Sequence, residues 1–150
     1  LPVVGELNRN IGRANFCRTL GVMLKSGIPA VEALRITADV TPNAVYARAI
    51  RRMGERVAQG ASLYATLPQR GHLFGGVVGS MVRVGEASGN LDATLLELND
   101  YYDKEVTAAT QNLGTVLEPI LLIFIGLIVA FVASAIILPI YQFSGSIKRR

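Results

Sequence analysis

Cysteine and histidine are almost missing from this sequence, and tryptophan is absent. The 150 residues include one cysteine, Cys17, and one histidine, His72. A single cysteine excludes an internal disulfide and any zinc site built on several cysteines. A lone histidine in a different segment offers little for a metal site or for a nucleophile activated by an imidazole. The sequence therefore predicts no catalytic residue, no metal ligand and no cofactor.

Charge is also scarce, and part of the positive excess lies at one end of the chain. Charged residues make up 17% of the sequence, with 15 basic and 11 acidic side chains and a formal net charge of +4. Three of the basic residues, Lys148, Arg149 and Arg150, end the chain. The remainder is close to neutral, so we expect no nucleic acid among the partners.

Hydrophobic residues, in contrast, are plentiful and locally concentrated. They make up 51% of the chain, and the run ILLIFIGLIVAFVASAIILPI from Ile120 to Ile140 contains no charge. A helix of this length crosses a hydrocarbon core about 30 Å thick. We therefore predict a membrane span, the alternative being a buried helix of a soluble protein. The run is no secretory signal because it lies at the carboxyl end.

The residues before this run predict a string of helices. Apolar residues recur at helical spacing, and no segment shows the sustained alternation of a strand. Gly27 and Gly60 are placed to end helices, Asn10 to cap the first helix, and Thr41-Pro42 to begin the third. The predicted fold is all-α: an antiparallel helical bundle of about six helices followed by one C-terminal transmembrane helix. We place the bundle at residues 1–117, the span at 118–141 and a short basic tail at 142–150.

The stretch VGEASGNLD resembles a phosphate-binding loop at first sight, but it fits a helix end better. Gly85 lies near the end of the fifth predicted helix, and Gly89 suits a left-handed residue that closes it. Asn90 is then a natural N-cap, and Asp92 places negative charge in the next first turn. Only Glu86 has no predicted structural role. A phosphate loop would need a GK[ST] ending or a preceding strand, and both are missing.

The next helix is predicted to run directly into the membrane segment. An apolar stripe of period near 3.6 extends from Leu91 to Val116 without a glycine-rich linker, so we expect rigid coupling between bundle and span. Pro119 removes a backbone donor, and a kink or restart is expected there. Glu118 is interpreted as a boundary residue whose charge suits the start of a helix. The alternative is a charged contact with a neighbouring membrane helix.

Several motifs together resemble one known family. They are LPVVGEL at the start, F-x-x-x-L-x-x-x-L-x-x-x-G-x-P from Phe16 to Pro29, GASL, VGEASGNLD, YYDKEV, LEP and LPIY. They cover nearly the whole chain, in order, and resemble the inner-membrane platform proteins of type II secretion and type IV pilus systems, the F or C component. Members are usually longer, with two similar cytoplasmic helical domains and three spans. The chain resembles the second domain with the last span.

This resemblance implies a non-enzymatic scaffold in the bacterial inner membrane, with its helical domain in the cytoplasm. The implied partners are a hexameric assembly ATPase, other inner-membrane assembly proteins, pilin or pseudopilin, membrane lipid and further copies of the chain. Such platforms are thought to convert motion of the ATPase into extraction and addition of pilin subunits. By the positive-inside tendency alone, the basic tail would instead lie in the cytoplasm. We follow the family, because upstream spans would set the orientation.

Two charged groups are candidate partner faces. Four arginines of the third predicted helix lie opposite its apolar face, and three acids lie on the long helix. The basic group is Arg48, Arg51, Arg52 and Arg56, and the acidic group is Asp100, Asp103 and Glu105. The basic face is hypothesised to meet an acidic patch on the ATPase or an adaptor, or anionic lipid headgroups. For both groups the alternative is a solvated surface.

A transporter subunit is the alternative function. Glu118 and Ser134 would then line a path for ions or substrate. The predicted span contains no other ionisable residue and no broken-helix pattern beyond Pro119 and Pro139, which argues against this reading. A proton-flux assay in liposomes separates the two functions, because a scaffold should show no flux.

Overall fold

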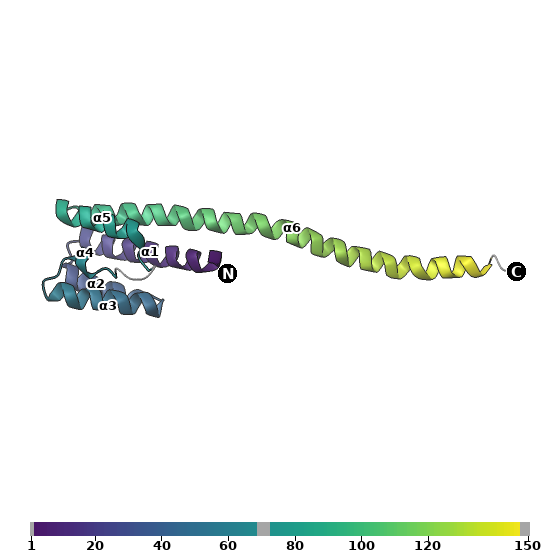
Figure 1. Ribbon diagram of the computed structural model, residues 1–150, viewed down its shortest axis with the longest axis horizontal. Helices are drawn as coiled ribbons and strands as arrows, with labels where there is room; N and C mark the ends of the chain where they lie inside the picture. Colours follow the sequence, from purple (N-terminus) through teal and green to yellow (C-terminus); the bar gives the residue numbers. More distant parts are fainter. Residues whose placement is uncertain (1, 69–72, 148–150) are drawn as a thin grey trace. The chain divides into compact units, whose positions relative to one another are not determined.

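The protein is all α-helical. The computed structural model describes residues 2–68 and 73–147, and these ranges contain six helices and no strand. The helices are α1 (Pro2–Lys25), α2 (Ala30–Val40), α3 (Ala44–Ala58), α4 (Leu63–Thr66), α5 (Gly75–Ser88) and α6 (Leu91–Ile147) (Figure 1). The predicted fold class is confirmed. His72 and the basic residues of the tail lie outside the described residues.

The chain divides into two units, Leu1–Ala109 and Thr110–Arg150. The first unit contains α1 to α5 and the beginning of α6. Within it, α1 lies between the start of α6 on one side and α2 and α3 on the other (Figure 1). The predicted division at residues 117 and 118 stays a prediction.

The core of the first unit is built from the apolar faces that the sequence predicts. Phe74 is its centre, since its ring makes edge-to-face contacts with Phe16 and Tyr46 at centroid distances of 4.7 and 5.5 Å. Such aromatic pairs add about 0.5–1.5 kcal/mol beyond the area they bury. Each described helix contributes to this core, with members that include Leu20, Leu34, Ile50, Met53, Leu63, Val78, Val82, Leu95, Leu98 and Tyr102.

Three helices end at a left-handed glycine, as the sequence predicts. Gly27, Gly60 and Gly89 have φ angles of 82°, 94° and 74°. At each end the glycine N–H donates to the carbonyl three residues back at 2.9–3.4 Å, and the following N–H donates five residues back at 2.9–3.1 Å. This pair of bonds is the Schellman motif, and it satisfies carbonyls that the helix end would leave unpaired. The chain reverses direction there without strain, since glycine has no Cβ.

The helix starts differ from the predicted ones. The first helix begins at Pro2 and not after Asn10, whose Oδ1 instead accepts from Arg13 Nη1 at 2.8 Å within α1. The third begins after Asn43, whose Oδ1 accepts from the Val45 N–H at 2.9 Å, and not at Thr41-Pro42. Several polar residues lie near each start. Which of them caps the helix depends on the bonds that their side chains make in the folded protein.

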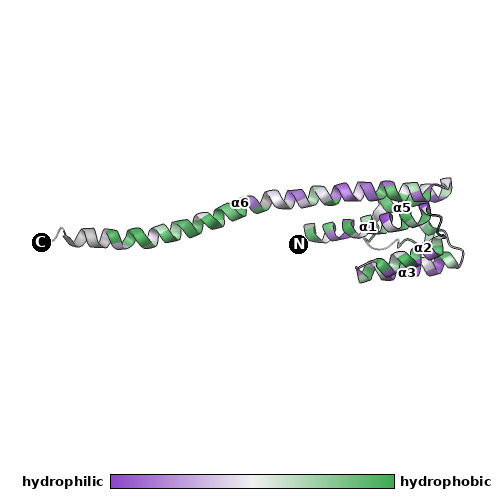
Figure 2. Cartoon of the chain, turned by 180° about the vertical axis from the view of Figure 1, so that it is seen from behind, coloured by the Kyte–Doolittle hydropathy of each residue, from purple (hydrophilic) through white to green (hydrophobic). Residues whose placement is uncertain are grey.

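Of the kink or restart predicted at Pro119, the restart is wrong, because the long helix α6 continues through both of its prolines; the kink stays a prediction. A proline removes one backbone donor, but the remaining bonds of a long helix keep its geometry, especially where no water competes for them. The helix is long and apolar enough to cross a membrane, judged by length and composition. Hydrophobic residues follow one another along its C-terminal part in Figure 2. Its apolar side chains there are exposed, among them Leu122, Phe124 and Phe131. This segment is the candidate membrane span.

The single thiol is predicted to be unreactive in the folded protein. Cys17 is fully buried, and this burial raises the pKa of its thiol to about 12. The thiolate is the reactive form, so both access and ionisation oppose alkylation. We expect iodoacetamide at pH 8 to label Cys17 only after denaturation. Mass spectrometry of the intact chain, with and without urea, measures this directly. Full labelling without denaturant would contradict the burial.

Candidate functional site

Glu86 stabilises the start of another helix, which the sequence did not predict. Its Oε1 accepts from the Leu63 N–H at 2.7 Å and its Oε2 from the Tyr64 N–H at 3.1 Å. Ser62 Oγ accepts from the Ala65 N–H at 3.2 Å, so three amides at the start of α4 have side-chain partners. A carboxylate is well placed there, because helix amides carry partial positive charge. The acid of VGEASGNLD is therefore a capping group, supplied by α5 to α4.

The rest of VGEASGNLD forms the tight junction between α5 and α6. Asn90 accepts through its backbone carbonyl from the Thr94 N–H at 3.0 Å, which starts the bonding of α6, and Asp92 lies in the first turn as predicted. Gly85 packs closely against the first turn of α6. A Cβ built on Gly85 would lie 2.7 Å from Thr94 Oγ1 and 3.2 Å from the Leu91 Cα. The stretch is thus a packing and capping motif.

The basic face of α3 is exposed, as predicted. Tyr46, Ile50 and Met53 are buried on one side of the helix, and the four arginines lie on the other. One of these four arginines, Arg51, forms an ion pair, because its Nη2 lies 2.9 Å from Asp39 Oδ1. Among the described residues, none of the other three arginines forms an ion pair with an acid.

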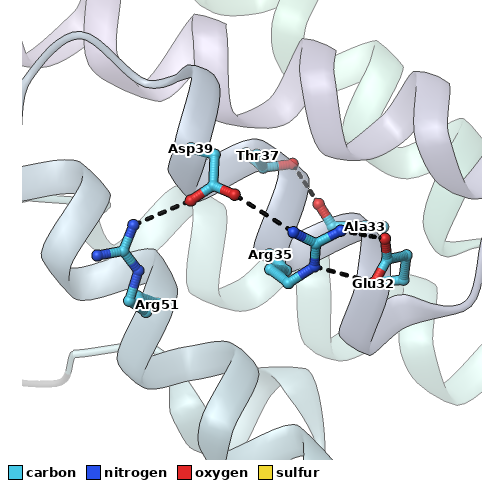
Figure 3. Close-up of polar contacts among 6 residues, drawn as sticks. All are labelled: Glu32, Ala33, Arg35, Thr37, Asp39 and Arg51. Atoms are coloured by element: carbon cyan, nitrogen blue, oxygen red, sulfur yellow. Dashed lines mark hydrogen bonds and ion pairs between the residues drawn. The ribbon is translucent and has the colours of Figure 1, made fainter.

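The pairing of Arg51 belongs to a chain of ion pairs that runs along α2 and reaches α3 through Arg51 (Figure 3). Asp39 also accepts from Arg35 Nη1 at 3.5 Å, and Arg35 pairs in turn with Glu32. The hydrogen bonds that Arg35 donates hold the pKa of the Glu32 carboxyl below its usual value. All of these groups are exposed, so each pair contributes little to stability. Their main effect is to hold the guanidinium groups of Arg35 and Arg51 in place.

The acidic group lies elsewhere in the same unit. Asp100, Asp103 and Glu105 are exposed on α6, and α1 separates this helix from α3 (Figure 1). Glu105 also lines a hollow of about 220 Å³ with Tyr101, Arg13 and Glu6. The structure therefore does not bring the predicted basic and acidic groups together within one chain. Whether either face contacts a partner stays a prediction.

One partly buried polar junction was missed at the level of sequence. The Leu73 carbonyl accepts from the Tyr46 hydroxyl at 2.6 Å and from Arg13 Nε at 2.8 Å. The Arg13 guanidinium also lies 5.6 Å from the ring centre of Tyr102, which is within cation–π range. Burial raises the pKa of the Tyr46 phenol. The junction ties α1, α3 and α6 to the segment before α5, and its role is structural.

The other residues that the sequence analysis singled out, Glu118, Pro119 and Ser134, lie in the second unit. Glu118 is exposed within α6, one residue before Pro119. The part of the chain that the structure describes contains no group of three or more His, Cys, Asp or Glu residues able to hold a metal ion. What the described arrangement offers is a packed helical unit with two charged faces and an apolar helical segment.

Comparison with known proteins identifies the family. Residues 16–139 match the family model described as type II secretion system (T2SS), protein F. The chain is 38% identical over 148 residues to the type IV pilus assembly protein PilC of Thermus thermophilus, covering 99% of this chain and 36% of that protein. It is 36% identical over 148 residues to PilC of Myxococcus xanthus, covering 99% of this chain and 35% of the relative.

A secretion protein is similar over nearly the same region. The chain is 35% identical over 140 residues to the type II secretion system protein F of Pseudomonas aeruginosa, covering 93% of this chain and 34% of that protein. The chain therefore spans about a third of the length of these relatives.

Proposed function

Because the chain belongs to the type II secretion system protein F family, we propose that it is a platform subunit of a bacterial type IV pilus or type II secretion machine. The family match over residues 16–139 is the observation that carries this proposal. The relatives include pilus assembly and secretion proteins at similar identity, so the proposal covers both machines.

In this proposal the chain works in the inner membrane without chemistry of its own. The apolar part of α6 spans the membrane, and the first unit lies in the cytoplasm. There it meets the hexameric assembly ATPase, while the membrane part contacts other assembly proteins and pilin or pseudopilin. Two observations support this arrangement. The first unit has a continuous core of its own, and the helix that leaves it is apolar enough to cross a membrane.

Binding to the assembly ATPase tests the coupling role. The whole chain in detergent micelles is mixed with the assembly ATPase of the same organism, with and without ATP. We expect saturable binding whose affinity depends on the nucleotide. An unrelated hexameric ATPase serves as the control and should not bind. If the folded chain bound the assembly ATPase in neither nucleotide state, the coupling role of these residues would be wrong.

A further inference from the structure

A groove between α2 and α3 lies beside the arginine face. It has a volume of about 230 Å³ and is lined by Val31, Arg35, Arg51, Gly54, Glu55 and Ala58. Its lining is almost entirely apolar, and Val31 is 41% exposed there. The ion pairs with Asp39 hold the guanidinium groups of Arg35 and Arg51 (Figure 3). A cavity of about 150 Å³ is enough for benzene, so this groove has room for one aromatic ring.

The unpaired arginines form a row along α3 next to this groove. Arg48, Arg52 and Arg56 follow one another at intervals of four residues, which is about 6 Å along the helix axis. All three are exposed. The α2–α3 surface therefore offers an apolar groove beside a row of positive charge that only Glu55 interrupts, and it suits a helix that carries an aromatic side chain between acids.

The beginning of α6 carries such a row. Glu97, Tyr101 and Glu105 recur at the same interval of four residues, and Asp100 lies next to the tyrosine. Tyr101 is 48% exposed, and among the described residues of the first unit no other aromatic side chain is classed as exposed. The described residues show no ion pair for any of these three acids.

We propose that these two surfaces bind each other between copies of the chain. Tyr101 of one copy packs in the α2–α3 groove of the next, and Glu97 and Glu105 pair with arginines of the row. Exposed ion pairs alone contribute little, so the buried aromatic ring is needed as the anchor. Within one chain the two surfaces cannot meet, because α1 lies between α6 and α3 (Figure 1).

The positions of the two surfaces determine the kind of assembly. They belong to different helices, α6 on one side of α1 and α2 with α3 on the other (Figure 1), so one copy binds two neighbours in a head-to-tail manner. Contacts of this kind produce rings when the rotation closes and filaments when it does not. This inference goes beyond the proposed function. It concerns the association of subunits, which can be measured without any pilus or secretion protein.

Two variants each remove one surface. The first, Arg48→Glu with Arg52→Glu, reverses the row on α3. The second, Glu97→Gln with Glu105→Gln and Tyr101→Ser, removes the acids and the ring on α6. A control matched to the first variant, Arg18→Glu with Lys25→Glu, makes the same change in net charge as that variant at exposed positions of α1. Retained helicity and the absence of Cys17 labelling show which variants are folded. If the second variant unfolds, a variant that keeps Tyr101 and carries only Glu97→Gln and Glu105→Gln is used in its place.

The mass of the whole chain in detergent, corrected for bound detergent, measures the association. We expect complexes of three or more copies for the wild type and for the control, and monomers for each surface variant alone. An equimolar mixture of the two variants should form dimers and nothing larger, because it contains one intact pair of surfaces. A monomeric wild type, a surface variant that associates like the wild type, or a mixture that stays monomeric would overturn the proposal. Loss of ATPase binding by the first variant with unchanged mass would also overturn it and would assign the arginine row to the ATPase.

Discussion

Replacing Gly85 by alanine is expected to destabilise the first unit by about 1–3 kcal/mol, the usual cost of forcing an extra group into a packed interior. The new Cβ would lie 2.9 Å from the Thr94 Cβ and 3.2 Å from the Leu91 Cα. Neither atom is the end of a flexible side chain, so α5 and α6 must move apart. The gain in helix propensity from alanine, up to about 1 kcal/mol, offsets only part of this cost.

The labelling rate of Cys17 measures this effect, because the buried thiol reacts only when the unit opens. A loss of 1–3 kcal/mol corresponds to labelling that is about 5- to 150-fold faster. Gly79→Ala is the matched control on the same helix, since its Cβ would lie 3.9 Å from the nearest side-chain atom. That variant should label at the wild-type rate or more slowly. Equal rates for the two alanine variants would contradict the close packing at Gly85.

Replacing Glu86 by alanine is expected to cost about 1.5–3 kcal/mol, the range for hydrogen bonds to a charged group. The change leaves the Leu63 and Tyr64 amides without the carboxylate oxygens at 2.7 and 3.1 Å. Glu86→Gln keeps one acceptor oxygen and loses the charge, so its effect should be intermediate.

Urea unfolding in detergent, followed by Cys17 labelling, measures both Glu86 variants. Asp103→Ala removes an exposed acid whose carboxylate caps no helix among the described residues, and it should change stability by less than about 0.5 kcal/mol. If Glu86→Ala were as stable as Asp103→Ala, the carboxylate would not cap α4 in solution.

The helix ends could be predicted from sequence because their bonds are local. The Schellman motif at Gly89 uses the carbonyls of Glu86 and Gly85, all within six consecutive residues. The spacing of apolar residues likewise places Ile50 and Met53 in the core and the arginines of α3 on the surface. These features depend on the period of the helix and on the backbone freedom of glycine.

The features that sequence could not predict join distant residues. Glu86 caps amides 22 and 23 residues earlier, and Tyr46 bonds a carbonyl 27 residues later. No local pattern marks such pairs, because they depend on how α3, α4 and α5 pack in three dimensions. The same holds for the groove beside Arg51, which exists only once α2 and α3 are side by side.

Fibre assembly in the source organism tests the central claim most directly. The gene that encodes the chain is deleted, and surface pili or secreted substrate proteins are measured before and after the intact gene is restored. The account predicts that the deletion abolishes pilus assembly or secretion, that pilin or pseudopilin accumulates unassembled in the membrane, and that the restored gene reverses both effects. Normal fibres and normal secretion in the deletion strain would contradict it.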